Sequence, residues 1–347
     1  MVHPSGTPVL PARLSAQLLA GPAAAGPVEA TRRLLAVQAQ DPRGVRLAIR
    51  ARTPPGSVTA FERELTDARS LVVTWLNRGT LHLVAAEDYF WLHALSAPPL
   101  FTANARRLTE EGVSPAAAER GVTVIERALG HDGPLSRAQL RERLQAAGVP
   151  TAGQALVHVL MLASLRGLAV RGPMSGGEHA YVLVRDWLGE PPAVDRDHAL
   201  AELARRYLAG HAPAGERDLV RWSGLTLRDA RAGLGAIAAE LVEREDGLLE
   251  LTDTGPPAPC PPPRLLGAYE PVLLGWRSRE FLVGTDQVVF TVNGLFRPFA
   301  LVRGRAAATW RLRGGKVSIE PLDELAADDA AALERDAKDV LSYLAVA

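Results

Sequence analysis

Two glutamines separated by a single alanine, Gln38 and Gln40, form the most distinctive chemical pattern in the chain. They end an apolar helical segment immediately before Asp41 and Pro42, and side chains at positions i and i+2 of a continuous helix point roughly 200° apart. Pro42 disfavours helical geometry at Asp41, so we expect the helix to end here and leave the two amides able to converge. Converged amides could orient a water molecule and direct carbonyl dipoles at a developing positive charge. Taken alone, these residues are explained more simply by a polar helix end with solvated amides.

Arginines surround this segment. Between residues 31 and 52 there is one acidic residue, Asp41, and there are six arginines: Arg32, Arg33, Arg43, Arg46, Arg50 and Arg52. The whole chain has 39 basic and 39 acidic residues, and acidic side chains concentrate between residues 320 and 338. A local positive surface that binds phosphates and a set of ordinary solvated faces explain the arginines equally well.

Several familiar catalytic signatures do not occur. The sequence has no Walker loop, no HExxH motif and no CxxC pair, and its single cysteine, Cys260, excludes an internal disulfide and a thiolate zinc site. Ser223 lacks the flanking glycines of a nucleophile elbow, and the histidines are scattered without ligand spacing. We therefore expect neither a metal nor a cofactor. No apolar run approaches the roughly 18 residues that span a bilayer, and the N-terminus lacks a secretory signal pattern, so we expect a cytoplasmic protein.

The middle of the chain predicts three helices followed by a hairpin. Apolar spacing indicates a helix over 116–130, and Ser136 with Gln139 forms a capping box that opens the second helix. Thr151 with Gln154 predicts another capping box for the third helix, which ends at Gly167, and two strands follow over 168–184. This order is typical of a winged helix.

The same order recurs on both sides of this segment. Downstream, helices are predicted over 199–208 and 216–222, Thr226 with Asp229 caps a third helix, and residues 241–251 form a hairpin that turns at Asp246 and Gly247. Upstream, the pattern is looser. It predicts helices over 28–40, 45–51 and 60–68, followed by a strand pair over 71–84 that turns at Asn77, Arg78 and Gly79. We interpret the chain as three winged-helix units.

A proline-rich linker over 256–263 precedes a change to strand-like patterns. Short strands are predicted over 280–283, 287–292, 299–302, 306–312 and 316–319, with a hairpin turn at Asn293–Gly294 and a last helix over 328–343. Five short strands with tight turns suggest a small barrel. The predicted fold class is α+β, with domains at 1–112, 113–192, 193–255 and 256–347.

The segment 34–52, with Gln38, Gln40 and the arginines that follow, resembles the winged-helix DNA glycosylases that excise alkylated guanines and unhook interstrand crosslinks. The AlkZ-like branch, known for azinomycin self-resistance, is the most similar. Further similar segments are 75–84 with Asp88 and Trp91, 222–225, 265–270, and the run from Asn293 through Gly304 to Trp310. The resemblance covers almost the whole chain, and the order and spacing of these segments carry it.

The resemblance implies three tandem winged helices and a C-terminal β-barrel in a C shape around duplex DNA, which agrees with the segmentation above. It makes Gln38 and Gln40 the catalytic pair. The other branch has a carboxylate at the second position, so Gln40 places this chain with the enzymes for crosslinks or bulky adducts, although Asp41 keeps a carboxylate mechanism open. A barrel hairpin that approaches DNA corresponds to residues 293–297. The implied protein is a bacterial, nucleoid-associated monomer that acts in antibiotic self-resistance.

The substrate follows from the chemistry of an amide. A glutamine side chain is a poor general base at neutral pH, but an N7-alkylated guanine already carries positive charge and leaves readily. Candidate DNA contacts are Arg43, Arg46, Arg50, Arg52, Arg78, His82, Asn293 and Arg297. For His82, strand alternation more simply indicates an exposed position on a half-buried hairpin without a role in DNA binding.

Two other functions compete with this interpretation. A tandem winged-helix transcription regulator would use its capped third helices to read the major groove, although the zero net charge and the few arginines in those helices weaken it. A paralogue that has kept the fold and lost the activity is the other alternative.

Overall fold

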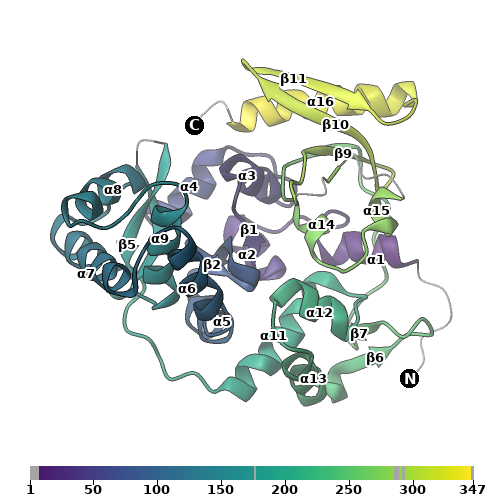
Figure 1. Cartoon of the computed structure of the whole chain (residues 1–347). Coiled ribbons are helices and arrows are strands. Elements are labelled where there is room, and N and C mark those ends of the chain that lie inside the picture. The colour runs from purple at the N-terminus through teal and green to yellow at the C-terminus, as the bar shows by residue number, and fades with distance from the viewer. Residues whose placement is uncertain (1–7, 176, 285–288, 291–293, 345–347) are drawn as a thin grey trace. The chain divides into compact units, whose positions relative to one another are not determined.

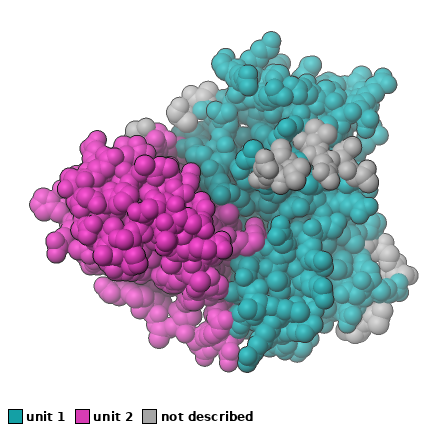
Figure 2. All heavy atoms as spheres, in the orientation of Figure 1, with its two compact units in different colours: residues 1–61, 200–347 teal, residues 62–199 magenta. Residues whose placement is uncertain are grey.

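The computed structural model describes residues 8–175, 177–284, 289–290 and 294–344 (Figure 1). Its Cα positions divide into two compact units, one made of residues 1–61 with 200–347 and the other of residues 62–199 (Figure 2). The predicted first domain, 1–112, contributes to both units. The four-domain division stays a prediction.

The unit of residues 62–199 contains an antiparallel sheet in which four strands lie in the order β3, β2, β4, β5. The strands are β2 (Leu71–Leu76), β3 (Thr80–Ala85), β4 (Ala169–Ser175) and β5 (Glu178–Leu183). The predicted strand pair over 71–84 is confirmed, and its turn places Arg78 at φ 46° and Gly79 at φ 76°. All six residues of β2 are buried, as expected for an interior strand with both faces covered.

Helices complete this unit. They are α5 (Tyr89–Ser96), α6 (Leu100–Glu110), α7 (Pro115–Asp132), α8 (Arg137–Ala146), α9 (Ala155–Leu165) and α10 (Val184–Trp187). The capping box of Ser136 and Gln139 is confirmed. The predicted box of Thr151 and Gln154 is wrong, because α9 begins one residue after Gln154, whose backbone N–H donates instead to the carboxylate of Glu111 at 2.9 Å.

In the other unit, the predicted helices and hairpin of residues 199–251 are confirmed with small shifts of their ends. They are α11 (Arg196–His211), α12 (Glu216–Ser223), α13 (Leu227–Ala236), β6 (Leu241–Glu243) and β7 (Leu249–Leu251). The Thr226 hydroxyl accepts a hydrogen bond from the backbone of Asp229, as predicted for the N-cap of α13.

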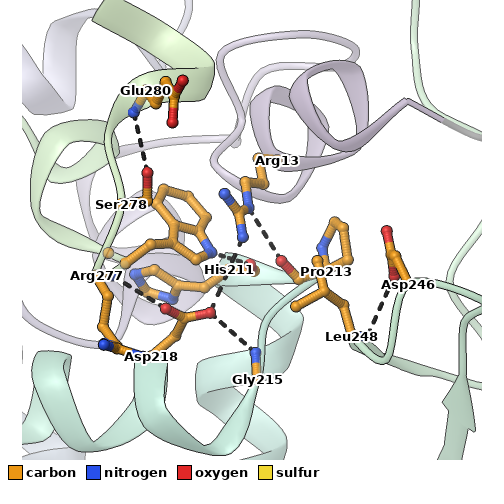
Figure 3. A network of polar contacts seen from close by, with 12 residues as sticks. Arg13, His211, Pro213, Gly215, Asp218, Asp246, Leu248, Arg277, Ser278 and Glu280 are labelled. Carbon is orange, nitrogen blue, oxygen red and sulfur yellow. Dashed lines mark hydrogen bonds and ion pairs between the residues drawn. The ribbon is translucent and has the colours of Figure 1, made fainter. Parts of the chain in front are cut away.

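A buried arginine connects the N-terminal helix α1 (Val9–Ala16) to these helices (Figure 3). The Arg13 Nε donates to the Pro213 carbonyl at 3.0 Å, and Nη2 lies 4.0 Å from the Asp218 carboxylate. Its guanidinium also lies 4.6 Å from the ring centroid of Trp276 and 4.5 Å from that of Phe281. Burial lowers the pKa of Arg13 to about 10, so the side chain stays charged. Segments distant in sequence are therefore joined within one unit.

The C-terminal strands form an open sheet in the order β11, β10, β9, β8 among the described residues. They are β8 (Arg264–Leu266), β9 (Phe299–Val302), β10 (Arg305–Arg313) and β11 (Lys316–Pro321), and helix α16 (Ala327–Leu344) packs against them (Figure 1). Leu265, Trp310, Leu333 and Val340 form the core between sheet and helix. The predicted strands over 299–302, 306–312 and 316–319 and the last helix are confirmed.

The predicted strand over 280–283 is wrong. These residues form a short helix, α15 (Glu280–Val283), after α14 (Pro271–Leu274). The Ser278 hydroxyl accepts from the Glu280 backbone N–H at 3.2 Å, and so short an apolar run does not distinguish strand from helix. Most of the predicted strand over 287–292, and Asn293, lie outside the described residues. No described helix is both long and apolar enough to cross a lipid bilayer.

Candidate active site

Helix α2 (Pro27–Leu34) ends well before the predicted position at Gln40. The next residue, Leu35, has φ 64° and ψ −50°, and the Ala36 N–H donates to the Leu34 carbonyl at 2.8 Å. These values define a γ-turn of the strained kind, rare for a residue with a side chain. Leu35 is fully buried, so packing of its side chain holds the turn in place.

After this turn the glutamines lie in an extended segment, and not at the end of a helix as predicted. Val37 and Gln38 form β1 (Val37–Gln38), and alternate side chains of an extended chain point to the same face. The Gln38 Nε2 donates to the Gln40 Oε1 at 2.5 Å. Gln38 is 7% exposed, whereas Gln40 is exposed. The two side-chain amides are thus hydrogen-bonded to each other, with Gln38 buried and Gln40 facing solvent.

Asp41 is the N-cap of helix α3 (Pro42–Arg50). Its Oδ1 accepts from the Gly44 backbone N–H, and Pro42 occupies the first turn, where its missing N–H costs nothing. One oxygen of the carboxylate is therefore used to begin the helix. This favours a structural role for Asp41 over the alternative carboxylate mechanism.

Two glycines bring the turn after β8 against the first turn of α3. A Cβ at Gly44 would overlap the Ala268 carbonyl oxygen, and a Cβ at Gly267 would lie 2.8 Å from the Gly44 Cα. Only residues without a side chain permit this approach. Tyr269, which follows Ala268, therefore lies close to the segment that carries the glutamines.

Arg52 is not available to bind phosphate, contrary to the prediction. Its side chain is fully buried, and Nη2 lies 2.5 Å from Oε1 of Glu270, which is also fully buried. Nε donates to the Gln17 carbonyl at 2.7 Å and Nη1 to the Ala48 carbonyl at 2.8 Å. The arginine follows the inward face of α3, which the sequence did not reveal.

Arg50 is also used inside the protein. Its Nη2 lies 2.5 Å from the Asp336 Oδ1 on α16, and both side chains are mostly buried. The second oxygen of Asp336 accepts from the Leu265 backbone N–H at 2.6 Å. The pair joins α3, β8 and α16, and the phosphate contact at Arg50 stays a prediction.

Arg43 and Arg46 lie at the surface, and their predicted contact with DNA stays a prediction. Arg43 is exposed and Arg46 half-buried, and both line an open cavity of about 520 Å³. The other lining residues are Leu312, Gly314, Gly315, Leu341 and Leu344. Gly314 and Gly315 form the turn between β10 and β11, with φ 54° and 73°, so the cavity has basic and apolar walls.

His82 is buried, with 3% of its surface exposed, and not on an open face of its hairpin. Its Nδ1 lies 2.9 Å from the Thr80 carbonyl oxygen. Burial, with a smaller contribution from the positive charge of Arg78, lowers the pKa of His82 to about 3. A neutral core histidine results, so the predicted DNA contact at His82 is wrong. Arg78 is half-buried in the turn of the same hairpin.

The predicted DNA-facing hairpin is partly described. Phe290 and Phe296 form an antiparallel bridge, and the Arg297 N–H donates to the Val289 carbonyl at 2.8 Å. Arg297 is exposed, and Leu295 exposes 57% of its surface. Asn293 lies outside the described residues. The described part agrees with a hairpin at this position.

Tyr269 is a residue of this region that the sequence analysis did not single out. It has φ 56°, and its ring centroid lies 5.8 Å from that of Phe296. The only sequence signal was its place in the segment 265–270.

A pair of neutral amides, with no ionised base in hydrogen-bond contact among the residues that the structure describes, fits hydrolysis of a bond whose leaving group is already activated. The family model of AlkZ-like DNA glycosylases matches residues 31–343. The chain therefore belongs to the AlkZ-like DNA glycosylase family and is an enzyme of that class.

Two comparisons with individual proteins agree. The chain is 27% identical over 338 residues to the interstrand DNA cross-link repair glycosylase of Streptomyces sahachiroi, a match that covers 89% of this chain and 88% of that protein. The solved structure of the DNA glycosylase AlkZ from Streptomyces sahachiroi superposes with a TM-score of 0.78 at 23% identity and covers 96% of this chain and 94% of the other. The second match shows the fold.

Proposed function

We propose that this protein is a monofunctional DNA glycosylase that hydrolyses the N-glycosidic bond of N7-alkylated guanine, bulky or crosslinked, in duplex DNA. The observation that carries the proposal is the hydrogen-bonded amide pair of Gln38 and Gln40, with Asp41 used as a helix cap beside it. The name of the Streptomyces sahachiroi relative, an interstrand DNA cross-link repair glycosylase, supports the substrate class.

The reaction needs little from the protein. Water adds through its oxygen to C1′ while the C1′–N9 bond breaks, and the electron pair of that bond neutralises the positive charge of the alkylated ring. The proton of the water passes to solvent, which leaves an abasic site and a free base. The amides orient the water and stabilise the oxocarbenium-like sugar with their carbonyl dipoles. An intact guanine, a far poorer leaving group, would require an acid or base that the pair does not provide.

DNA would lie along the basic side of α3. Arg43 and Arg46 are placed to contact phosphates, and the hairpin that contains Arg297 would approach the same duplex. We assign the helix and hairpin segments of 1–112, 113–192 and 193–255 to winged-helix units, and residues 256–347 to a small barrel. A monomer in the bacterial cytoplasm that protects its host from a DNA-alkylating natural product completes the proposal.

The alternative of a transcription regulator has an observation against it. Nine of the eleven residues of α9, one of the two third helices that such a regulator would insert into the major groove, are buried in the core of residues 62–199. A helix covered in this way cannot present its side chains to base edges.

The direct test uses duplexes that each carry one N7-alkylguanine, either a methyl or a bulky adduct, beside an undamaged duplex. We expect release of the free modified base, seen by chromatography, and strand scission at that position after heating in alkali. The undamaged duplex should remain intact. If neither lesion yields an abasic site, the proposed function is wrong.

A further inference from the structure

The backbone on either side of Tyr269 is fixed by two independent contacts. On one side, Ala268 lies against Gly44 at the first turn of α3, where no Cβ can be accommodated. On the other side, Glu270 is fully buried and ion-paired with Arg52. Because both neighbours are fixed, the direction of the Cα–Cβ bond of Tyr269 is fixed as well.

Tyr269 adopts a backbone conformation that tyrosine rarely has. Its φ of 56° lies in the left-handed region, which favours glycine and, among other residues, asparagine. Such strained residues persist only where their surroundings hold them, and they are found preferentially at functional sites. The ring is half-buried, so part of it faces solvent.

Aromatic rings continue from Tyr269 to Phe296 and Phe290, which form an antiparallel bridge. The Phe296 centroid lies 5.8 Å from that of Tyr269, and the Phe290 centroid lies 6.2 Å from that of Phe296. The guanidinium of Arg279 lies 5.1 Å from the Phe296 centroid and 5.3 Å from the Phe290 centroid, and its Nε donates to the Leu273 carbonyl at 2.6 Å. The row of rings is thus supported from the Arg279 side. We name Tyr269 and Phe296 the aromatic wall.

We propose that the aromatic wall binds the nucleobase next to the glutamine pair and, through Tyr269, selects a base that carries positive charge. This inference rests on the proposed function and adds a binding residue to it. The face of an aromatic ring carries the negative part of its quadrupole and attracts flat cations. An N7-alkylpurinium is such a cation, whereas an undamaged purine is neutral.

The charge of Asp41 acts in the same direction. Burial and, to a smaller extent, the Asp41 carboxylate raise the pKa of the Tyr269 hydroxyl, so the phenol is neutral at pH 7. The negative charge of the Asp41 carboxylate therefore makes the electrostatic potential at the Tyr269 ring more negative. A cationic base gains from both the ring and the nearby carboxylate, and it loses this gain when its charge is removed.

The test measures binding rather than cleavage. Two duplexes carry the same 2′-fluoroarabinose at the central position and differ only in the base on it. One base is N7-methylguanine, which keeps its charge and resists hydrolysis on this sugar, and the other is neutral 7-deaza-7-methylguanine. We expect the wild type to bind the cationic duplex about 3- to 20-fold more tightly than its neutral counterpart. Tyr269→Phe should keep this ratio. Tyr269→Asn, which removes the ring but suits the left-handed backbone, should bring it close to one.

A ratio of one for the wild type, or an unchanged ratio for Tyr269→Asn, would overturn the proposal. If Tyr269→Asn does not fold, Phe296→Leu is measured instead. Loss of the Phe296 ring should also lower the ratio of the affinities for the cationic and the neutral duplex. The measurement is independent of catalysis. If the wild type binds the cationic duplex more tightly but releases no base from a cleavable N7-alkylguanine duplex, the proposed glycosylase reaction is refuted. The proposed role of the aromatic wall is then still supported.

Discussion

The Nε2 of Gln38 donates a hydrogen bond to the Oε1 of Gln40 over 2.5 Å, across the single residue that separates them. The contact exists because the γ-turn at Leu35 ends α2 early and the chain continues extended. It ties the exposed amide of Gln40 to a residue that is 7% exposed. The pair is therefore oriented before any substrate arrives, as catalysis by positioned dipoles requires.

Replacing either glutamine should slow excision without weakening DNA binding. We expect Gln38→Ala and Gln40→Ala each to lower the single-turnover rate on an N7-alkylguanine duplex by about 10²-fold, the usual loss when one positioned dipole is removed. The double variant should lose less than the product of the two, because the amides act as one unit. Gln145→Ala, at an exposed site on α8, is the control. Full activity in both single variants would refute the amide mechanism.

The ion pair of Arg52 and Glu270 should dominate the local stability. Arg52→Met leaves a fully buried carboxylate without its cation, so we expect the free energy of unfolding in urea to fall by about 3–5 kcal/mol. Arg52→Met combined with Glu270→Leu should recover much of this loss. Arg43→Met, at an exposed site on the same helix, should change stability by less than about 0.5 kcal/mol. Equal stabilities for Arg52→Met and Arg43→Met would show that the pair is not buried as described.

Two buried histidines should make the protein sensitive to acid. Burial lowers the pKa of His82 to about 3 and that of His211 to about 3 in the folded state, against 6.5 for an unperturbed histidine. The unfolded chain therefore binds more protons below pH 6.5, and stability falls as the pH decreases from there towards 3. Each histidine contributes a slope of about 1.4 kcal/mol per pH unit.

Urea unfolding between pH 7 and pH 4 tests this slope. His82→Asn and His211→Asn should each flatten the loss of stability with pH, because asparagine keeps a donor near the position of Nδ1 and does not titrate. His198→Asn, at an exposed position on α11, should leave the slope unchanged. The prediction fails if all three variants show the wild-type pH dependence.

Arg43 should contribute to the salt dependence of DNA binding. Removing one phosphate contact lowers the slope of log K against log salt by about 0.9 for duplex DNA, so Arg43→Gln should show a decrease of about this size. Arg106→Gln, which also removes an exposed arginine but from α6 in the other unit, should show none. Filter binding at several salt concentrations distinguishes the two. The same slope for Arg43→Gln as for the wild type would remove Arg43 from the interface.

Local patterns in the sequence predicted most elements correctly. Ser136 with Gln139 and Thr226 with Asp229 marked helix starts that the structure has, because a cap depends on residues three positions apart and on little else. The turn at Asp246–Gly247 and the final helix followed from equally local signals. The family resemblance, which rested on the order and spacing of several segments, also came from the sequence.

The sequence by itself determined that two amides lie directly before Asp41 and Pro42, among arginines, in a chain of the AlkZ-like family. Only the tertiary structure decided how these residues are used. The strained turn at Leu35 is held by burial of its side chain, which no local pattern encodes, and Arg50 and Arg52 meet acidic partners 286 and 218 positions away. Tyr269 likewise lies near Asp41 only because Gly44 and Gly267 allow two distant backbones to touch. Partners so far apart in the chain come together through packing, and packing depends on the whole fold at once.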